Sequence, residues 1–327
     1  MRVLAGDIGG TKTLLAILER TPGGSLVVLE RRRYDSRAYP GLGPMLREFL
    51  DATDHDRHVT RAGFGVAGPV VGGRSRVTNL PWEIDAARLR DELGLVAVAL
   101  VNDFAAVAHG LVALRDDDLE VLQPGRRDPA GPVALIGAGT GLGEAILVPT
   151  AAGPHFLPSE GGHCDLAPRN DTEIALLRFL LARHHRVSYE RVVSGRGLHA
   201  TYDFVVASGL APELPETRAR IDAGDPGAVI GTHALAGDDP ACVRAVEIFL
   251  DLYGAEAGNL ALKVLPTGGL YVAGGIAGKL LPLLRAGRFM QAFRDKGRMS
   301  PLLADMFVAV IKNPDVGLLG AALAGLA

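Results

Sequence analysis

The chain has 327 residues, 48% of them hydrophobic and 22% charged, which is typical of a globular protein with one or two domains. Its formal net charge of −3 argues against a protein that coats nucleic acid, so we expect no nucleic-acid partner. Only Cys164 and Cys242 are present, which excludes a disulfide framework and a cysteine-rich zinc site. No apolar run approaches ~20 residues and no signal peptide is recognisable, so we expect a cytoplasmic protein without a membrane partner.

The first third of the chain predicts strands with a few helices between them. Apolar runs bounded by turn residues predict strands at 3–5, 14–18, 26–32, 62–67, 70–77 and 96–101. Helical spacing predicts helices over 44–50, 85–93 and 105–114. We expect 62–67 and 70–77 to form a hairpin around Gly68-Pro69. The strand 96–101 delivers Asn102-Asp103 at its carboxyl end, where open α/β sheets present ligand-binding residues.

A domain change is expected near 112–130, where acidic residues and a Pro-Gly-Arg-Arg run interrupt the apolar pattern. Beyond it, strands are predicted at 133–136, 144–148, 270–273 and 307–311. Helices are predicted over 173–183, 242–265 and 316–326, with a further helix opened by Gly274-Gly275. Each half of the chain therefore begins with a strand and a glycine-rich turn, as in a duplicated scaffold.

The two glycine-rich turns are the strongest functional signal. They are Asp7-Ile-Gly-Gly-Thr-Lys12 and Gly137-Ala-Gly-Thr-Gly-Leu-Gly143, each between apolar strand-like runs. Glycine lets backbone N–H groups approach an anion closely, and the Thr hydroxyls add donors. A carboxylate at Asp7 beside phosphate-binding groups makes sense with a divalent cation. Together the turns indicate a nucleotide-dependent phosphotransferase.

Other nucleotide-binding motifs fit less well. A dinucleotide-binding fingerprint needs a helix after the glycine turn, whereas 144–148 reads as a strand. A helix at 144–148 would favour a nucleotide-dependent dehydrogenase, and a strand there would argue against one. Neither turn has the Gly-Lys-Ser/Thr ending of a P-loop. A strand–turn–strand phosphate hairpin, used twice, remains.

The chain resembles the bacterial glucokinases of the sugar kinase, actin and Hsp70 superfamily over nearly its whole length. Eight motifs in the family's order carry the resemblance: Asp7-Ile-Gly-Gly-Thr, Thr78-Asn79 with Trp82, Asn102-Asp103-Phe104, Gly137 to Gly143, Glu160-Gly-Gly-His163, Glu190 to Gly195, Gly274-Gly275-Ile276 and Lys296-Gly-Arg298. Lys12 departs from the family pattern, in which Asn is expected. It adds a positive charge near the phosphates or points to solvent.

The resemblance implies a role for each polar motif residue. Asp103 is expected to be the catalytic base, because a hydroxyl that attacks a γ-phosphoryl group must lose its proton. The alternative is an aspartate that only caps the following helix. The sugar ligands are expected to be Asn79, Asn102, Asp103, Glu160, His163 and Glu190. Gly161-Gly162 could instead form an ordinary turn, and a zinc role for His163 lacks further ligands.

The nucleotide is expected to contact both glycine turns. The residues implied are Asp7, Gly9, Gly10, Thr11, Lys12, Gly137, Gly139, Thr140 and Gly141, with Gly274, Gly275 and Ile276 at the adenosine. Gly274-Gly275 could alternatively be a tight strand-to-helix packing turn. Asp7 is expected to hold Mg²⁺ through water, because this cation keeps much of its hydration shell.

The resemblance further implies a two-domain, actin-like ATPase (ribonuclease H-like) α/β fold with a ligand cleft between the domains. We expect a small α/β domain at 1–112 plus 312–327 and a large α/β domain with helical insertions at 113–311. The activity implied is ATP-dependent phosphorylation of D-glucose at its 6-hydroxyl, in a cytoplasmic homodimer. The alternatives are a kinase of another hexose and a non-catalytic, sugar-responsive regulator on the same scaffold.

Overall fold

The computed structural model describes residues 1–53, 58–77, 80–151 and 153–327. The chain divides into two compact units, which we call unit 1 (1–118 and 313–327) and unit 2 (119–312). The sequence predicted a small domain at 1–112 plus 312–327 and a large domain at 113–311, and these domain boundaries remain a prediction.

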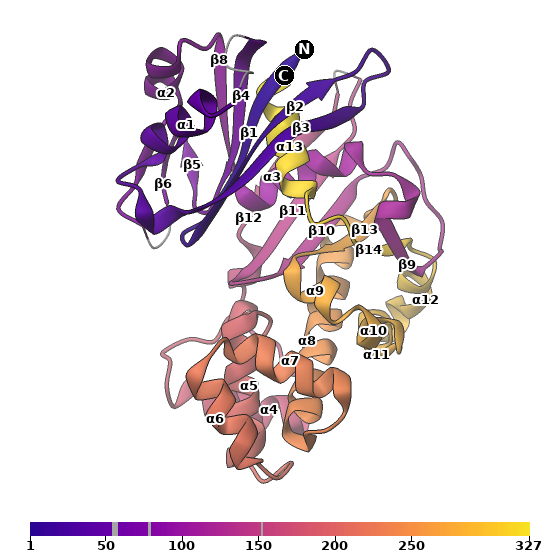
Figure 1. Cartoon of the computed structure of the whole chain (residues 1–327). Coiled ribbons are helices and arrows are strands. Elements are labelled where there is room, and N and C mark those ends of the chain that lie inside the picture. The colour runs from indigo at the N-terminus through magenta and orange to yellow at the C-terminus, as the bar shows by residue number, and fades with distance from the viewer. Residues whose placement is uncertain (54–57, 78–79, 152) are drawn as a thin grey trace. The chain divides into compact units, whose positions relative to one another are not determined.

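Unit 1 is built on a mixed sheet with the strand order β3-β2-β1-β4-β8 (Figure 1). Its strands are β1 (Arg2–Ile8), β2 (Lys12–Arg20), β3 (Leu26–Asp35), β4 (Val59–Val66) and β8 (Ala97–Asn102). β1, β2 and β3 pair antiparallel, whereas β1, β4 and β8 run parallel. The helices are α1 (Leu42–Asp51), α2 (Ala86–Leu93), α3 (Asp103–Gly110) and α13 (Val316–Leu326).

Apolar residues cover both faces of this sheet. On one face α1 contributes Met45 and Phe49 to a core with Phe64 of β4. On the other face the last helix, α13, packs on β1, β4 and α3. This contact is unusually close, because a Cβ at Gly63 or Gly320 would collide with a carbonyl oxygen of the opposing element. The C-terminal segment therefore belongs to the core of unit 1.

Unit 2 repeats the sheet of unit 1 with one added strand. The order is β12-β11-β10-β13-β14-β9. The strands are β9 (Leu119–Gln123), β10 (Val133–Ala138), β11 (Leu142–Val148), β12 (His155–Ser159), β13 (Gly269–Ala273) and β14 (Val308–Ile311). As in unit 1, the consecutive strands β10, β11 and β12 pair antiparallel, and β10, β13 and β14 run parallel. The duplicated scaffold expected from the two glycine turns is thereby confirmed at the level of strand order.

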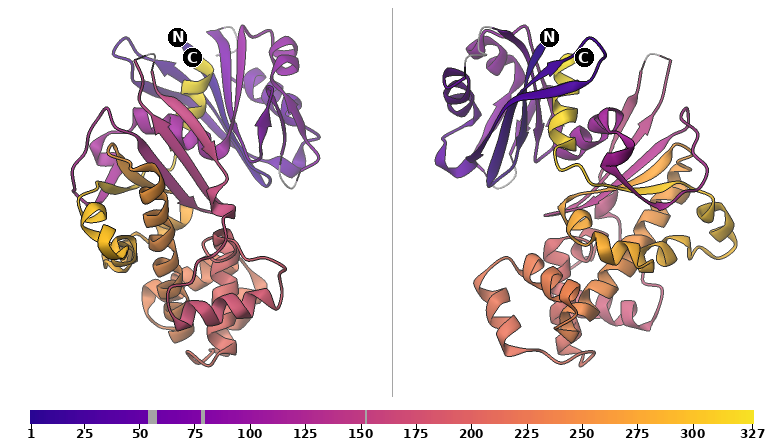
Figure 2. Two further views of the ribbon diagram at one scale, coloured as in Figure 1. Left: turned by 180° about the vertical axis from the view of Figure 1, so that it is seen from behind. Right: turned by 45° about the vertical axis from the view of Figure 1, so that its right-hand side comes forward.

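The helices of unit 2 gather around the 25-residue helix α8 (Pro240–Val264), as both views in Figure 2 show. The others are α4 (Asp171–Leu181), α5 (Gly195–Ala207), α6 (Pro215–Ala223), α7 (Pro226–Ala236), α9 (Gly275–Lys279), α10 (Leu281–Arg285), α11 (Arg288–Arg294) and α12 (Ser300–Ala304). Sixteen residues of α8 are buried, which explains why its apolar pattern runs almost all the way round.

Two expectations about strands need correction. The predicted hairpin of 62–67 with 70–77 was wrong, because β4 pairs with β1 and β8 instead. Val70–Val71 (β5) turns back at Gly72-Gly73 to pair with β6 (Arg74–Arg76), and β7 (Glu83–Asp85) completes a separate small sheet. Both turn glycines have positive φ angles of 58° and 74°, which suits a tight two-residue hairpin. The edge strands β9 and β12 were not predicted.

Among the described residues, none of the helices combines the length and apolar character needed to cross a bilayer.

Candidate active site

The first glycine turn joins β1 to β2 in unit 1. The Gly9 N–H donates to the Lys12 carbonyl oxygen at 3.0 Å and closes the turn. The buried hydroxyl of Ser36 donates to the Gly9 carbonyl at 2.8 Å and lies 3.0 Å from the Thr13 hydroxyl. Thr11 and Lys12 are exposed at the tip. The turn is therefore held from below while its outer face stays accessible to a ligand.

Two carboxylates of unit 1 lie near one another beside this turn. Asp7 is the penultimate residue of β1, and Asp103 begins α3 directly after β8. Desolvation and the negative charge of Asp103 raise the pKa of Asp7 to about 6, although part of its side chain remains exposed. A divalent cation would relieve this repulsion, so the pair fits Mg²⁺. The described residues contain no group of three or more His, Cys, Asp or Glu side chains that could hold a metal ion.

Asn102 and Asp103 occupy the strand-to-helix junction expected from the sequence. Asn102 is the N-cap of α3, with its side-chain oxygen accepting from the Phe104 and Ala105 N–H groups at 2.9 and 3.2 Å. Its amide donates to the Gly68 carbonyl at 3.2 Å. The Asp103 carboxylate also accepts from Phe104 N–H, at 2.8 Å, and is half-buried. Because Asn102 already caps the helix, Asp103 is not needed for that structural role.

The second glycine turn joins β10 to β11 in unit 2. The Gly139 N–H donates to the Gly141 carbonyl at 2.8 Å, and the Gly139 carbonyl accepts from Gly195 N–H at 2.9 Å. Gly274, with φ of 90°, packs so closely that a Cβ there would collide with the Ala138 carbonyl oxygen. The segments 137–141, 194–195 and 274–275 thus meet at one end of the sheet of unit 2. Because 144–148 lies within β11, the structure excludes the helix that a dinucleotide-binding fingerprint requires.

A cavity of about 630 Å³ in unit 2 opens beside this turn. Its size is that of a small-molecule site. It brings together Gly139 and Thr140 of the turn with Gly275 and Ile276 of α9. The remaining lining residues come mainly from α5, α7 and α9, and include Arg196, His199, Asp225, Thr232, Leu235 and Lys279. Sequence reasoning missed these residues, although Gly195 at the end of a quoted motif pointed to this place.

Three of the expected sugar ligands lie together in unit 2. Glu160 precedes the short 3₁₀ helix η5 (Gly161–His163), and Glu190 lies in η6 (Tyr189–Arg191). His163 Nε2 is 3.8 Å from Glu160 Oε2, and His163 Nδ1 is 4.0 Å from Glu190 Oε1. The three side chains are 82%, 55% and 33% exposed for Glu160, His163 and Glu190. Accessible carboxylates can accept hydrogen bonds from vicinal hydroxyls, and the imidazole N–H between them can donate one.

Glu190 connects these residues to the second glycine turn. Its Oε2 accepts from Leu142 N–H at 3.0 Å, and a Cβ at Gly141 would collide with the same oxygen. Ser194 Oγ donates to the Glu190 carbonyl at 2.7 Å and caps α5 through Gly197 N–H. One carboxylate therefore contacts the turn with one oxygen and faces His163 with the other.

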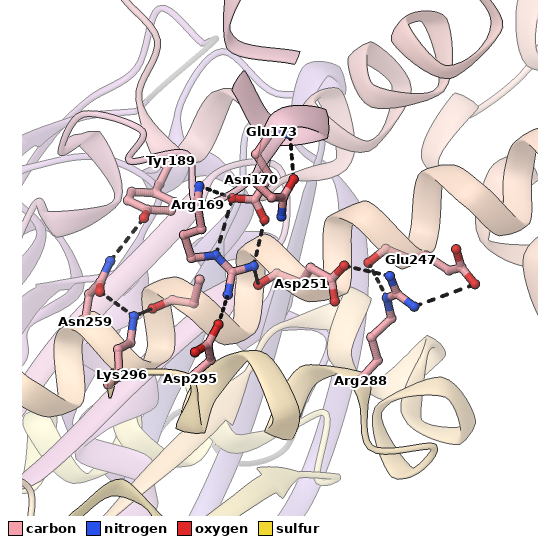
Figure 3. Close-up of polar contacts among 11 residues, drawn as sticks. Arg169, Asn170, Glu173, Tyr189, Glu247, Asp251, Asn259, Arg288, Asp295 and Lys296 are labelled. Carbon is pink, nitrogen blue, oxygen red and sulfur yellow. Dashed lines mark hydrogen bonds and ion pairs between the residues drawn. The ribbon is translucent and has the colours of Figure 1, made fainter. Parts of the chain in front are cut away.

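A polar network holds Tyr189, the residue before Glu190 in the chain (Figure 3). Tyr189 OH accepts from the Asn259 amide at 3.0 Å, and Asn259 Oδ1 accepts from Lys296 Nζ at 2.6 Å. Lys296 also donates to the Ala255 carbonyl at 2.9 Å. The Lys296 ammonium, part of the Lys296-Gly-Arg298 motif, is thus engaged within the protein. The same figure shows Arg169 bound to Glu173, which ties the start of α4 to α8.

The expected site residues therefore fall into one group in each unit. Unit 1 holds Asp7, Gly9, Gly10, Thr11 and Lys12 at one turn, and Asn102 and Asp103 at the end of β8. Unit 2 holds Gly137, Gly139, Thr140, Gly141, Gly274, Gly275 and Ile276 around the second turn, with Glu160, His163 and Glu190 nearby. Asn79 lies outside the described residues.

Solved structures show the same fold. The crystal structure of glucokinase from an Antarctic psychrotroph superposes with a TM-score of 0.85 and 31% identity, over 99% of this chain and 98% of that one. A ROK family glucokinase from Streptomyces griseus, in complex with glucose and AMPPNP, gives 0.64 at 21% identity over 98% of both chains, which speaks to the fold alone. The protein is therefore an α/β protein with the two-domain, actin-like fold of the sugar kinases.

Sequence comparison gives the family. The model of the glucokinase family matches residues 4–326. The glucokinase of Nostoc sp. is 48% identical over 98% of both chains. The chain belongs to the glucokinase family, as the resemblance of its motifs implied.

Proposed function

We propose that this protein transfers the γ-phosphoryl group of ATP to the 6-hydroxyl of D-glucose, giving glucose 6-phosphate and ADP. The observation that supports it most is the position of Glu190, which contacts the second glycine turn through Leu142 N–H and faces His163 with its other oxygen. A sugar held by this carboxylate lies beside a turn suited to phosphate. Membership of the glucokinase family supports the same activity.

In this proposal Asp103 is the catalytic base and hydrogen-bonds the reacting hydroxyl. Proton transfer to a positioned carboxylate contributes about 10²–10⁴-fold to such reactions, and in phosphoryl transfer much of the effect is orientation. Asn102, Glu160, His163, Glu190 and the undescribed Asn79 bind the other sugar hydroxyls.

The donor contacts both glycine turns in this proposal. The turn of unit 1 contributes Gly9, Gly10, Thr11 and Lys12, while the base and ribose occupy the cavity beside Gly275 and Ile276. Apolar Leu235 and Ile276 suit an aromatic base, whereas a bare polyphosphate would leave them unused. Mg²⁺, held through water by Asp7, would neutralise phosphate charge when bound.

The proposal includes a cytoplasmic homodimer with no nucleic-acid partner. Sedimentation of the purified protein tests the dimer, with a single monomer-sized species as the contradicting result.

A coupled assay tests the activity. Glucose, mannose, fructose and N-acetylglucosamine are each combined with ATP, ADP and polyphosphate. We expect the highest kcat/KM for glucose with ATP. Preference for another hexose would replace the substrate but keep the kinase, and absence of phosphorylation of every sugar would overturn the proposal.

A further inference from the structure

Two buried glutamates of unit 2 lie close to each other. Glu144 lies on β11 and is 3% exposed, and Glu256 lies on α8 and is 0% exposed. Their carboxyl groups lie within reach of each other. Among the described residues, Oε1 of each has no hydrogen-bond donor. Two ionised carboxylates have no proton to offer one another, so a hydrogen bond between them forms only when one carboxyl group is protonated.

The surroundings of the pair favour one negative charge rather than two. The Asn259 amide donates to Glu256 Oε2 at 2.8 Å, and Lys263 Nζ lies 3.8 Å from Glu256 Oε1. The charged and titratable side chains that face the pair are Lys263 and Tyr253 of α8, Tyr189 of η6 and Lys296 after α11. Burial, and then the charge of Glu256, raise the pKa of Glu144 to about 7; burial also raises that of Glu256. Asn259 and Lys263 stabilise the charge on Glu256, which leaves the proton on Glu144.

Glu144 also supports the turn that carries two of the expected sugar ligands. A Cβ at Gly161 would collide with Glu144 Oε2, so the carboxyl group occupies the space beside this glycine. Gly161 N–H is bound to Ser159 Oγ at 3.0 Å, and a Cβ at Gly162 would collide with the Leu142 carbonyl oxygen. The backbone of η5 is thus in van der Waals contact with β11 on this side. A movement of the Glu144 carboxyl group toward η5 would therefore displace Gly161, which lies between Glu160 and His163.

We propose that Glu144 and Glu256 share one proton and thereby position the Glu160–His163 turn for glucose. This inference rests on the proposed function, because it takes Glu160 and His163 as sugar ligands. When the shared proton is lost, two adjacent buried charges repel, and the side chain of Glu144 moves against Gly161. Glucose then binds more weakly, while kcat changes little because the proposed base, Asp103, lies in the other unit.

The kinetic test compares full-length wild type with Glu144→Gln over pH 6 to 9. The amide introduced by this substitution donates a permanent N–H to Glu256 and leaves the pair with a single charge. We expect the ratio of the wild-type to the variant glucose KM to be near 1 at acidic pH and to rise about three- to tenfold above neutral pH. Titrations common to both proteins cancel in this ratio. A ratio that stays constant with pH would overturn the proposal.

Two further variants separate positioning from a general effect of mutation. Glu256→Gln also leaves one charge in the pair, so its glucose KM should follow that of Glu144→Gln. This variant replaces Glu144→Gln in the test if Glu144→Gln does not fold. Glu173→Gln neutralises another buried glutamate of unit 2, one that is paired with Arg169, and its KM ratio to wild type should not vary with pH. A pH-dependent ratio in Glu173→Gln equal to that of Glu144→Gln would contradict a specific role for the pair.

A spectroscopic measurement keeps this inference distinct from the proposed function. The infrared difference between wild type and Glu144→Gln at acidic pH should contain the C=O stretch of one protonated carboxylic acid, which disappears as the pH rises. This band is expected even if the protein phosphorylates a sugar other than glucose. Its absence would overturn the shared proton, whereas a protein without kinase activity but with the band would overturn only the proposed function.

Discussion

The two glycine hairpins stand on the same arrangement of strands but are supported by different side chains. In unit 1 the order β3-β2-β1-β4-β8 places the β1–β2 turn beside two parallel strands, and in unit 2 the order β12-β11-β10-β13-β14 does the same for the β10–β11 turn. In unit 1 a buried serine, Ser36, binds the turn from below. In unit 2 the turn is bound by a backbone N–H, from Gly195, and by a carboxylate, from Glu190.

The surroundings differ in charge as well. Two neighbouring carboxylates, Asp7 and Asp103, accompany the hairpin of unit 1, whereas the hairpin of unit 2 borders a cavity lined by apolar residues together with basic ones such as Arg196 and Lys279. In the proposed function, the repeated sheet supplies two turns suited to phosphate, and the segments inserted after it supply further ligands. Between β12 and β13 unit 2 carries η5, η6 and α4 to α8, whereas between β3 and β4 the described residues of unit 1 carry η1 (Ser36–Ala38) and α1. The comparison predicts separable effects, on phosphoryl transfer in unit 1 and on donor and sugar binding in unit 2.

The largest effect is expected from Asp103→Asn in unit 1. The amide keeps the acceptor for Phe104 N–H but cannot take the proton of the sugar hydroxyl. We expect kcat to fall by about 10³-fold or more, with glucose affinity largely retained. Steady-state kinetics and direct glucose binding check the two halves of this statement. A near-normal kcat would contradict the role of Asp103 as the base. Asp117→Asn, at an exposed acid of the same unit, is the control and should leave kcat unchanged.

A second prediction concerns the adenosine side of unit 2. Gly274→Val places a branched side chain against the Ala138 carbonyl at a backbone φ of 90°. We expect a loss of about 2–4 kcal/mol in the free energy of unfolding and a rise of the ATP KM by about tenfold or more. Gly278→Ala is the matched control, because no atom lies within 4 Å of its Cβ position. Equal behaviour of the two variants would show that close packing at Gly274 is unimportant.

Local signals in the sequence predicted most strands of the two sheets. Continuous apolar runs marked the central strands, and the glycine turns marked the hairpins, because both signals are local. The position of Asn102-Asp103 after a strand was predicted in the same way and is confirmed. The edge strand β9 was missed because its five residues include charged and half-exposed positions. Strand 62–67 was assigned the wrong partner, since pairing depends on residues far away in the chain.

The candidate site was only partly accessible to such reasoning. Family motifs named Glu160, His163 and Glu190, but their proximity to one another depends on tertiary packing of η5 against η6. The cavity residues from α5 and α7 carry no local motif, and neither does the contact of Glu144 with Gly161. The catalytic and ligand roles of all these residues remain predictions for the experiments described.

A third prediction uses the stability of unit 2 as a function of pH. Glu144 has a folded pKa of about 7 against an ordinary value of 4.5, so the folded protein binds more protons than the unfolded chain between these values. The contribution of this group is therefore fully present below about pH 4.5 and is lost as the pH rises through about 7. Relative to wild type, Glu144→Gln should gain on the order of 1–3 kcal/mol between pH 5 and pH 8. Urea unfolding of both proteins at pH 5 and pH 8 measures the difference in their free energies of unfolding. The same difference at both pH values would contradict the prediction.

The smallest effect is expected at the support of the first hairpin. Ser36→Ala removes the donor to the Gly9 carbonyl and the partner of Thr13, and leaves two buried polar atoms less well satisfied. We expect a loss of about 1–2 kcal/mol in the free energy of unfolding and a modest rise in the ATP KM, with kcat almost unchanged. Thr21→Ala, at the exposed turn at the opposite end of β2, removes a hydroxyl that donates to Ser25 and should alter neither quantity appreciably. If Ser36→Ala and Thr21→Ala behave alike, the turn of unit 1 does not depend on a buried support.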